Sequence, residues 1–246
     1  AMLRSIREAG PTSDLVIVGG GDGTINSVID TLLDLEKPLG ILPLGTANDL
    51  ARTLALPARP EEAAEVILRG RTQRIDIGRV NDKSFVNVAS LGMSADMARA
   101  LTAEIKATWG VLGYPISLWQ VLKRRRSIRV EIDCDGRKLR ARAIQISVGN
   151  GRFYGGGMAI AADAAIDDGT LDMVLMAPQT LWQLLRRLPI FRWGWHDLNA
   201  TVSHLRGREI TLKATRTVPI NTDGEITTET PAEFRLLPKA LEVFVP

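Results

Sequence analysis

A glycine-rich turn between an apolar stretch and a helical pattern constrains the fold of this chain more than any other feature. It lies in "LVIVGGGDGTIN", residues 15–26. Residues 14–18 predict a buried strand, and residues 24–36 predict a helix because their apolar side chains recur at helical spacing. Glycines at such a turn let backbone amides approach phosphate oxygens, and the N-terminus of the following helix favours anions. The stretch therefore predicts a phosphate-binding turn in an α/β sheet.

Asp22 stands inside this turn, where its carboxylate would repel a bound phosphate. No lysine follows, so the loop is not a P-loop, and its glycines lack the spacing of a Rossmann dinucleotide turn. A divalent cation would resolve the conflict, with Mg²⁺ bridging the carboxylate and the phosphate. The alternative is that Asp22 and Gly23 simply form a turn after a buried strand.

A second strand–turn–helix pattern follows in "LPLGTANDLAR", residues 42–52. Thr46 offers a hydroxyl at the start of the helix, and we expect it to be the N-cap residue, with Asp49 completing a capping box. Because neighbouring strands of a parallel sheet end at the same edge, both loops would line one crevice. Capping alone would also explain Thr46 and Asp49.

The pattern of elements changes near residue 73. Before it, strands alternate with helices, the last of which begins at Pro60 and ends before Gly70, so residues 1–73 predict an α/β domain with a parallel sheet. After it, strands pair around short turns such as Asp135-Gly136, so residues 74–246 predict a second, mainly antiparallel β domain. We expect helices within that domain at residues 95–123 and 180–187.

Composition and charge limit the protein class. The single cysteine, Cys134, excludes an internal disulfide, favours a reducing compartment and is expected to be a buried thiol in a hairpin strand. No apolar run is long enough to cross a bilayer. The net charge is only +3, but basic residues gather in residues 122–130 and 181–216. These clusters suit a nucleic acid or an anionic membrane surface, or else form a solvated face.

Two loops together indicate a family. "GGGDGTIN" followed by "LPLGTANDLAR" closely resembles the catalytic domain of diacylglycerol kinases, including bacterial lipid kinases and their sphingosine-kinase relatives. The resemblance continues in order through "RIDIGRVN", "FVNVASLG", "VGNGRFYGGGM", "DDGTLDMV" and "NTDGE". NAD kinases share the first loop, but the second makes the match specific. The resemblance implies an NAD-kinase-like parallel sheet, a β-sandwich second domain, and transfer of phosphate from ATP, with Mg²⁺, to a lipid hydroxyl.

The resemblance also implies roles for individual residues. Asp223 and Glu225 match the acidic pair of the family, one of which is the general base. The residues expected to bind the nucleotide are Gly21, Asp22, Gly23, Thr24, Ile25, Asn26, Ser27 and Thr46. The family often has Glu where this chain has Ser27. Without the resemblance, Asp223-Gly224 is interpreted first as a hairpin turn.

Five further positions match metal-associated residues of the family. The Asp168 carboxylate, with the carbonyls of Ala165 and Thr170, corresponds to a structural Mg²⁺ loop. Asp49 and Asp76 correspond to acidic positions linked to a Mg²⁺–water network between the domains. From the residues alone, Asp168-Gly169 is also a plain turn, and Asp76 on a regularly alternating strand would face water.

Several expectations concern partners and alternatives. We expect a lipid substrate at the membrane surface, peripheral contact with the inner face of the membrane in the cytoplasm, and no nucleic acid, and we leave a homodimer open. Trp182, Trp193 and Trp195 lie among arginines, which suits a membrane interface or interior packing. Nothing matches the strand–helix–strand unit with which family members ordinarily begin. The alternatives are an NAD-kinase-like enzyme with a soluble substrate and a catalytically weak lipid- or nucleotide-binding protein.

Overall fold

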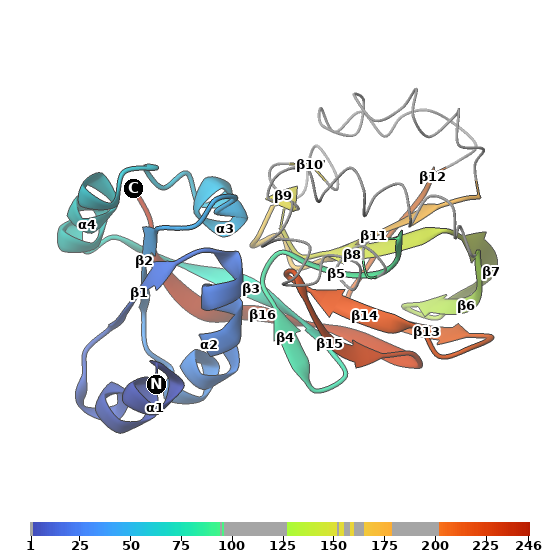
Figure 1. Ribbon diagram of the computed structural model, residues 1–246, viewed down its shortest axis with the longest axis horizontal. Coiled ribbons are helices and arrows are strands. Elements are labelled where there is room, and N and C mark those ends of the chain that lie inside the picture. The colour runs from blue at the N-terminus through green and yellow to red at the C-terminus, as the bar shows by residue number, and fades with distance from the viewer. Residues whose placement is uncertain are drawn as a thin grey trace, which may run out of the picture.

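The chain folds into two adjoining lobes, an α/β lobe that contains the N-terminus and a lobe built mainly from β-strands (Figure 1). The computed structural model describes residues 2–93, 95, 127–151, 153, 154, 158, 159, 165–178 and 202–246. The helices expected at residues 95–123 and 180–187, apart from residue 95, and Trp182, Trp193 and Trp195 lie outside the described residues. Within the described ones, no helix combines the length and the apolar composition that a membrane span requires.

The first lobe is built on two parallel strands, β1 (Val16–Gly20) and β2 (Leu39–Pro43), joined by helix α2 (Asp22–Leu35). This confirms the predicted strand–helix–strand order. The predicted end of the last helix is also confirmed, because Gly70 has a φ of 73° and its N–H donates to the carbonyl of Ile67. The other elements of this lobe are α1 (Met2–Ala9), the 3₁₀ turn η1 (Gly10–Thr12), α3 (Asp49–Thr53) and α4 (Pro60–Arg69).

Two long antiparallel strands, β3 (Thr72–Val80) and β16 (Ala232–Phe244), run through both lobes. Near the end of β16, Val243 pairs in parallel with Leu39 of β2, so the C-terminal residues pack into the first lobe. A boundary between residues 73 and 74 therefore falls inside β3. The register between the two strands shifts between Leu237 and Leu241, where β16 forms a bulge.

The second lobe is a sandwich of two sheets, as predicted. One sheet continues from the first lobe in the order β1-β2-β16-β13-β6-β7, with β3 pairing to β16 and β4; the other is antiparallel in the order β12-β11-β8-β5-β14-β15. The strands are β4 (Lys83–Phe85), β5 (Val88–Gly92), β6 (Ile128–Cys134), β7 (Arg137–Ala143), β8 (Gln145–Gly149), β11 (Leu171–Met176), β12 (Val202–Gly207), β13 (Glu209–Ala214), β14 (Pro219–Thr222) and β15 (Glu225–Glu229), besides a separate pair, β9 (Phe153–Tyr154) and β10 (Met158–Ala159).

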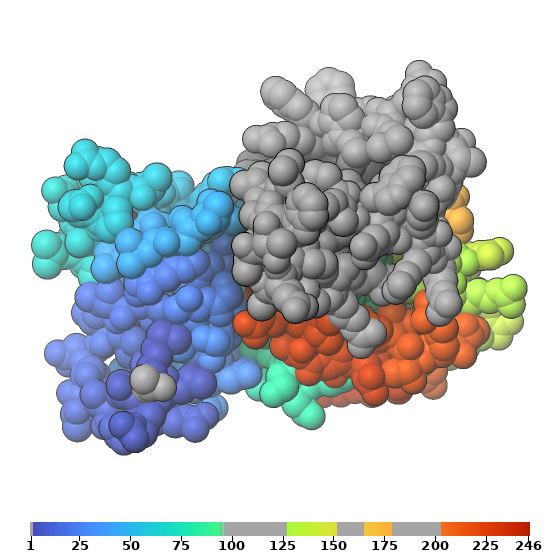
Figure 2. All heavy atoms as spheres, viewed as in Figure 1, coloured from blue at the N-terminus to red at the C-terminus, as the bar shows by residue number. Residues whose placement is uncertain are grey.

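Each lobe has its own apolar core. In the sandwich, the alternating inward residues of both sheets meet around Phe85 and Phe234. Gly78 is required there, because a Cβ at this position would lie 2.2 Å from the Phe85 ring. Cys134 is buried in the same core, as predicted. In the space-filling view, the residues of the first lobe, blue to cyan, and the red strands of the sandwich form adjoining masses (Figure 2).

Candidate functional site

The two loops singled out by the sequence come into backbone contact. A Cβ at Gly45 would lie 2.4 Å from the Cα of Gly21, and a Cβ at Gly21 would lie 3.0 Å from the Cα of Gly45. Only residues without a side chain permit this approach. The β1–α2 and β2–α3 loops therefore form one surface at the ends of two parallel strands, as the sequence predicted.

Asp22 connects these loops through its carboxylate. Its Oδ2 accepts the backbone N–H of Asp49 at 3.0 Å, and its Oδ1 accepts the N–H of Leu50 at 3.0 Å. Both donors belong to the first turn of α3, so the negative charge lies at a helix N-terminus, where it is stabilised. Two amides of α3 thus stabilise the Asp22 carboxylate, which keeps its negative charge beside the glycine-rich turn.

The predicted capping box is wrong. Helix α3 begins at Asp49, its N-cap is Asn48 with a φ of 50°, and no side chain of the described loop residues caps it locally. Asn48 instead closes its own loop, because its Oδ1 accepts the N–H of Gly45 and its Nδ2 donates to the carbonyl of Gly45, both at 2.9 Å. This closure leaves Thr46 exposed on the surface, while Asp22 takes the Asp49 amide that Thr46 would have capped.

The N-terminus of α2 offers backbone amides to a ligand. Gly21 is its N-cap and, among the described residues, no side chain caps it. A Cβ at Gly23 would have no described atom within 4 Å, so a ligand could approach the backbone there. Such a helix end favours phosphate.

The remaining residues of the predicted nucleotide loop differ in what they can contribute. The side chain of Ile25 is buried in the core, and its backbone N–H donates to the carbonyl of Gly21 at 3.1 Å, so neither is available to a ligand. The hydroxyl of Ser27 donates to the carbonyl of Thr24 at 2.7 Å. The side-chain oxygen of Asn26 is buried without a hydrogen-bond partner among the described residues.

Asp223 lies in the tight turn between β14 and β15, with a φ of 48° followed by Gly224 at 105°. Its Oδ2 accepts the N–H of Val86 at 2.7 Å, and its Oδ1 accepts the amides of Asn87 at 3.1 Å and Val88 at 2.9 Å. The hairpin-turn interpretation is therefore confirmed. Three consecutive amides, two from the β4–β5 connection and one from the start of β5, hold the carboxylate in one orientation.

Burial raises the pKa of Asp223 to about 6, although the hydrogen bonds from the amides of Val88, Val86 and Asn87 act in the opposite direction, and the Asp22 carboxylate adds to the rise. A carboxylate with a pKa near neutrality can accept a proton from a substrate and still be ionised at pH 7. Glu225, at the start of β15, is exposed. The two acidic residues therefore have different environments, and Asp223 has the one that suits a base.

Asp76 is fully buried, so it does not face water. Its Oδ1 accepts the N–H of Lys239 at 2.7 Å in the bulge of β16, and its Oδ2 accepts the N–H of Gly169 at 2.8 Å. The bulge frees the Lys239 amide from the strand ladder, and the carboxylate satisfies it. Asp76 thereby links the bulge to the loop that contains Asp168.

The Asp168 loop presents hard oxygen groups on one short turn. The Asp168 Oδ1 accepts the N–H and the hydroxyl of Thr170 at 3.0 and 2.7 Å, and its Oδ2 accepts the N–H of Ala165 at 3.3 Å. One carboxylate with neighbouring carbonyls is a donor set that suits Mg²⁺ when waters complete it. In the part of the chain that the structure describes, no three His, Cys, Asp or Glu side chains converge as a metal-binding group.

Asp49, the remaining predicted metal-associated residue, is buried beside Asp22 at the start of α3. The Arg52 guanidinium lies 3.8 Å from its Oδ1. The structure thus brings Asp49 to the predicted nucleotide loop, whereas Asp76 and Asp168 lie together at the bulge of β16.

Two asparagines that sequence reasoning did not assign lie between these groups. The Nδ2 of Asn87 donates to Asp22 Oδ1 at 3.4 Å. The Nδ2 of Asn150 donates to the carbonyl of Asp76 at 2.7 Å and to that of Val86 at 3.0 Å. Their positions in "FVNVASLG" and "VGNGRFYGGGM" were the only available signal. Both join the segment that holds Asp223 to the residues around it.

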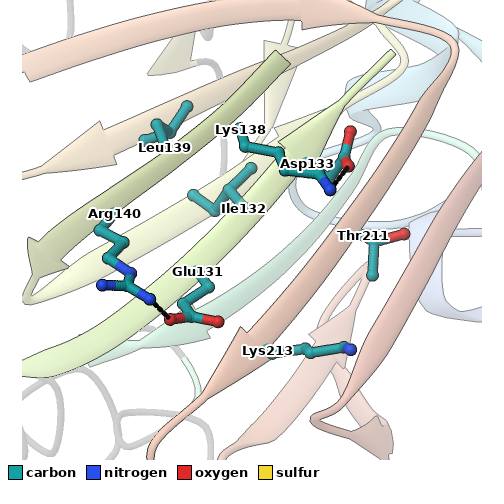
Figure 3. Close-up of a pocket in the computed structure, with 8 residues that line it drawn as sticks. All are labelled: Glu131, Ile132, Asp133, Lys138, Leu139, Arg140, Thr211 and Lys213. Carbon is teal, nitrogen blue, oxygen red and sulfur yellow. Dashed lines mark ion pairs between the residues drawn. The ribbon is translucent and has the colours of Figure 1, made fainter. Parts of the chain in front are cut away.

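A depression of about 600 Å³ on the outer face of β6, β7 and β13 lies outside this arrangement. Figure 3 shows two ion pairs among its charged side chains, Arg140 with Glu131 at 2.8 Å and Lys138 with Asp133 at 4.0 Å. None of the predicted site residues lines it. The loops around Asp22 and Asp223 are therefore the better candidate for the functional site.

Comparison with known families gives two matches that together cover nearly all of the chain. The diacylglycerol kinase catalytic domain matches residues 1–80, and the YegS C-terminal NAD kinase beta sandwich-like domain matches residues 87–245.

Curated relatives and solved structures agree with these matches. A diacylglycerol kinase from Staphylococcus saprophyticus is 29% identical over 250 residues, covering all of this chain and 81% of that protein. One from Staphylococcus carnosus is 27% identical over 248 residues, with the same coverage. The crystal structure of a putative diacylglycerol kinase from Bacillus anthracis str. Sterne has a TM-score of 0.84 at 29% identity, covering 99% of this chain and 80% of that one. These similarities extend over both lobes.

Proposed function

Since the chain belongs to the family of diacylglycerol kinase-like bacterial lipid kinases, we propose that it transfers the γ-phosphoryl group of ATP to the hydroxyl of a diacylglycerol-like lipid, with Mg²⁺. The family makes the protein a lipid kinase; the nucleotide, the metal and the lipid are the proposed part. One observation carries the proposal. The N-terminus of α2, which favours phosphate, and Asp223, which suits a base, belong to different lobes and are linked through Asn87.

The first lobe supplies the phosphate site. Backbone amides at the start of α2 would donate to phosphate oxygens, and Gly23 leaves room for their approach. Two amides of α3 stabilise the Asp22 carboxylate, which keeps its charge, so a Mg²⁺ ion bound with the nucleotide would be needed to offset its repulsion of the phosphates. Asp22 therefore keeps the two loops together while the amides of α2 stay available to the nucleotide.

Asp223 would act on the lipid hydroxyl. Its carboxylate accepts the hydroxyl proton while the lipid oxygen forms a bond to the γ-phosphorus. The bond between that phosphorus and the bridging oxygen breaks, and its electrons remain on ADP. The three amides that hold Asp223 fix its orientation and leave one lone pair of Oδ2 for the proton.

Mg²⁺ would neutralise phosphate charge during transfer when it is bound with ATP. A second, structural ion would be held by the Asp168 carboxylate with the carbonyls of Ala165 and Thr170. Asp76, whose carboxylate bonds to the Gly169 amide, would keep that loop in place. Asp49 lies beside Asp22 at the same loop and would add negative charge near the nucleotide-bound ion.

A radiolabel experiment on the full chain tests the proposal. Purified protein would be incubated with γ-labelled ATP, Mg²⁺ and mixed micelles that each contain one lipid hydroxyl class, with NAD as the soluble alternative. Label in a lipid supports the proposal, with the most efficient micelle identifying the acceptor. Label in NADP would instead support an NAD-kinase-like enzyme. Binding of ATP and lipid without any labelled product would support a catalytically weak binding protein.

A further inference from the structure

Asn87 lies between the carboxylates that the two lobes contribute to the site. Its backbone N–H donates to Asp223 Oδ1 at 3.1 Å, and its side-chain Nδ2 donates to Asp22 Oδ1 at 3.4 Å. Asp22 opens α2 in the first lobe, and Asp223 is at the turn of a hairpin in the second. Within the described structure, one residue thus donates to an acidic group from each lobe.

The side chain of Asn87 leaves a polar atom unsatisfied. Only 3% of the residue is exposed, and its Oδ1 has no hydrogen-bond partner among the described residues. If the Oδ1 and Nδ2 atoms of Asn87 were exchanged, the amide oxygen would face the Asp22 carboxylate, and the two oxygens would repel each other. Asp22 therefore fixes the orientation of the Asn87 amide. Burying an unpaired carbonyl oxygen costs free energy. If residue 87 only filled space, an apolar side chain would be more stable at this position than asparagine.

The backbone at Asn87 is itself held in place. Its carbonyl accepts the N–H of Asn150 at 2.9 Å, and the Asn150 side chain donates to the carbonyl of Val86 at 3.0 Å. The same side chain donates to the carbonyl of Asp76 in β3, a strand that runs through both lobes. These hydrogen bonds hold the backbone at Asn87 in place. Replacing its side chain should therefore affect the contact with Asp22 more than the local backbone.

We propose that Asn87 is a positioning residue that sets the separation between the phosphate-binding loop and the base by donating to Asp22 and to Asp223 at once. This inference rests on the proposed function, because it takes Asp223 as the base and α2 as the phosphate site. Asn87 places neutral N–H groups between two carboxylates that would otherwise repel each other.

The charges that face Asp223 define the test. The Asp22 carboxylate from α2 is the charge that acts on Asp223, the amides of residues 86–88 surround the carboxyl group, and Glu225, two residues further along the chain, is exposed. Asn87→Asp would add a third carboxylate between Asp22 and Asp223 without changing the shape of the side chain. The pKa of Asp223, measured by carboxyl-carbon NMR in the full chain, should then rise by about one pH unit or more.

Asn81→Asp is the matched control. Asn81 also donates through Nδ2, to Thr228 Oγ1 at 2.9 Å and to the backbone carbonyls of Glu229 and Pro231. It undergoes the same chemical change in the same lobe but does not touch the acidic pair. It should cost stability and leave the pKa of Asp223 within about 0.3 units of the wild-type value. An equal pKa in wild type and Asn87→Asp would overturn the proposal.

The Asn87→Ala variant tests whether Asn87 positions the two carboxylates or only contributes to the stability of the fold. We expect kcat to fall about tenfold or more, while KM for ATP changes less than about threefold, because the α2 amides remain. Unchanged kcat, or kcat and KM changing in step with those of Asn81→Ala, would also overturn the proposal. If wild type phosphorylates no substrate, the proposed function fails, and the NMR titration still reports whether Asn87 couples the two carboxylates.

Discussion

The carboxylate of Asp22 accepts the backbone N–H of Asp49 at 3.0 Å, across 27 positions of the chain. The glycine-rich loop of the first strand is thereby bonded to the first turn of the next helix. A negative charge at this point stabilises that helix end and the contact between the loops. The residue that seemed to conflict with phosphate binding is thus part of the framework of the site.

Replacing Asp22 should affect both stability and activity. Asp22→Ala removes the acceptor for two amides and should lower the free energy of unfolding by about 1–2 kcal/mol, as for the loss of a helix cap. It should also weaken nucleotide use, because the two loops lose their connection. Urea denaturation of the full chain measures the first effect, and the thermal shift on adding Mg·ATP measures the second.

Asp30→Ala is the control for this change on the same helix. Its ion pair with Arg79 is half exposed, with 3.8 Å between the charged atoms, and should matter little. If Asp22→Ala unfolds at the same urea concentration as Asp30→Ala, the capping role of Asp22 is refuted.

Asp223→Asn should nearly abolish phosphoryl transfer, with kcat falling about 10²-fold or more, because the amide cannot accept the proton. Asp135→Asn is a closely matched control. Asp135 also precedes a glycine in a hairpin turn, has a φ of 47°, and accepts the backbone amides of Arg208 and Glu209. If both variants lose a similar amount of stability but only Asp223→Asn loses activity, Asp223 is supported as the general base. If both variants keep equal activity, Asp223 is excluded as the base and Glu225 remains the candidate.

The pH dependence of the reaction should follow Asp223. Since burial raises its pKa to about 6, activity should rise through about pH 6 as the carboxylate ionises. Stability should change in the opposite direction. The folded state holds the proton more tightly than the unfolded chain, so this contribution to stability is complete below about pH 4 and is lost as the pH rises through about 6. Asp223→Asn should remove that part of the slope in urea titrations.

Asp172 should make the protein acid-sensitive. Although burial alone would raise its pKa, the hydrogen bonds from His204 at 2.8 Å and Arg206 at 2.9 Å lower it below the usual value. Its contribution to stability is therefore present above about pH 4 and is lost as the pH falls through the lowered pKa. Asp172→Asn should be less stable than wild type at pH 7, with the difference shrinking at pH 3. A constant difference would contradict this assignment.

Two glycines of the site should respond differently to alanine. Gly45→Ala would force a methyl group to 2.4 Å from the Cα of Gly21 and should separate the loops and destabilise the first lobe. Gly23→Ala meets no described atom within 4 Å and lies in α2, so it should stabilise the fold by about 0.5–1 kcal/mol. It should nevertheless raise KM for ATP, because the methyl group would occupy the approach to the backbone. An unchanged KM would place the phosphates elsewhere.

Local patterns accounted for much of the fold. Helix α4 begins at Pro60 and ends before Gly70 as predicted, because its start and end signals act within one turn of the chain. The hairpin turns at Asp135-Gly136 and Asp223-Gly224 formed because Asp and Gly accept the positive φ values that tight turns need. The family motifs likewise identified both lobes from short, contiguous stretches.

The predictions that were wrong or incomplete concern residues whose hydrogen-bond partners are far away in the sequence. Thr46 was expected to cap α3, but the amides of that helix bond to Asp22, which is far away in sequence and close in space. Alternation along a strand could not show whether Asp76 faces water, because its partners are the amides of Gly169 and Lys239 in two other segments. Neither partner can be identified from the neighbours of Asp76 in the chain.

The sequence by itself therefore determined the order of the elements, the two lobes and the glycine-rich turn, since these depend on residues that are adjacent or one helical turn apart. Only the tertiary structure decided which donors satisfy each buried carboxylate. A buried charge requires partners, and the folded chain supplies them from wherever a free amide lies, at the start of a helix, in a strand bulge or in a turn. That pairing fixes what Asp22, Asp76 and Asp223 can do in the site.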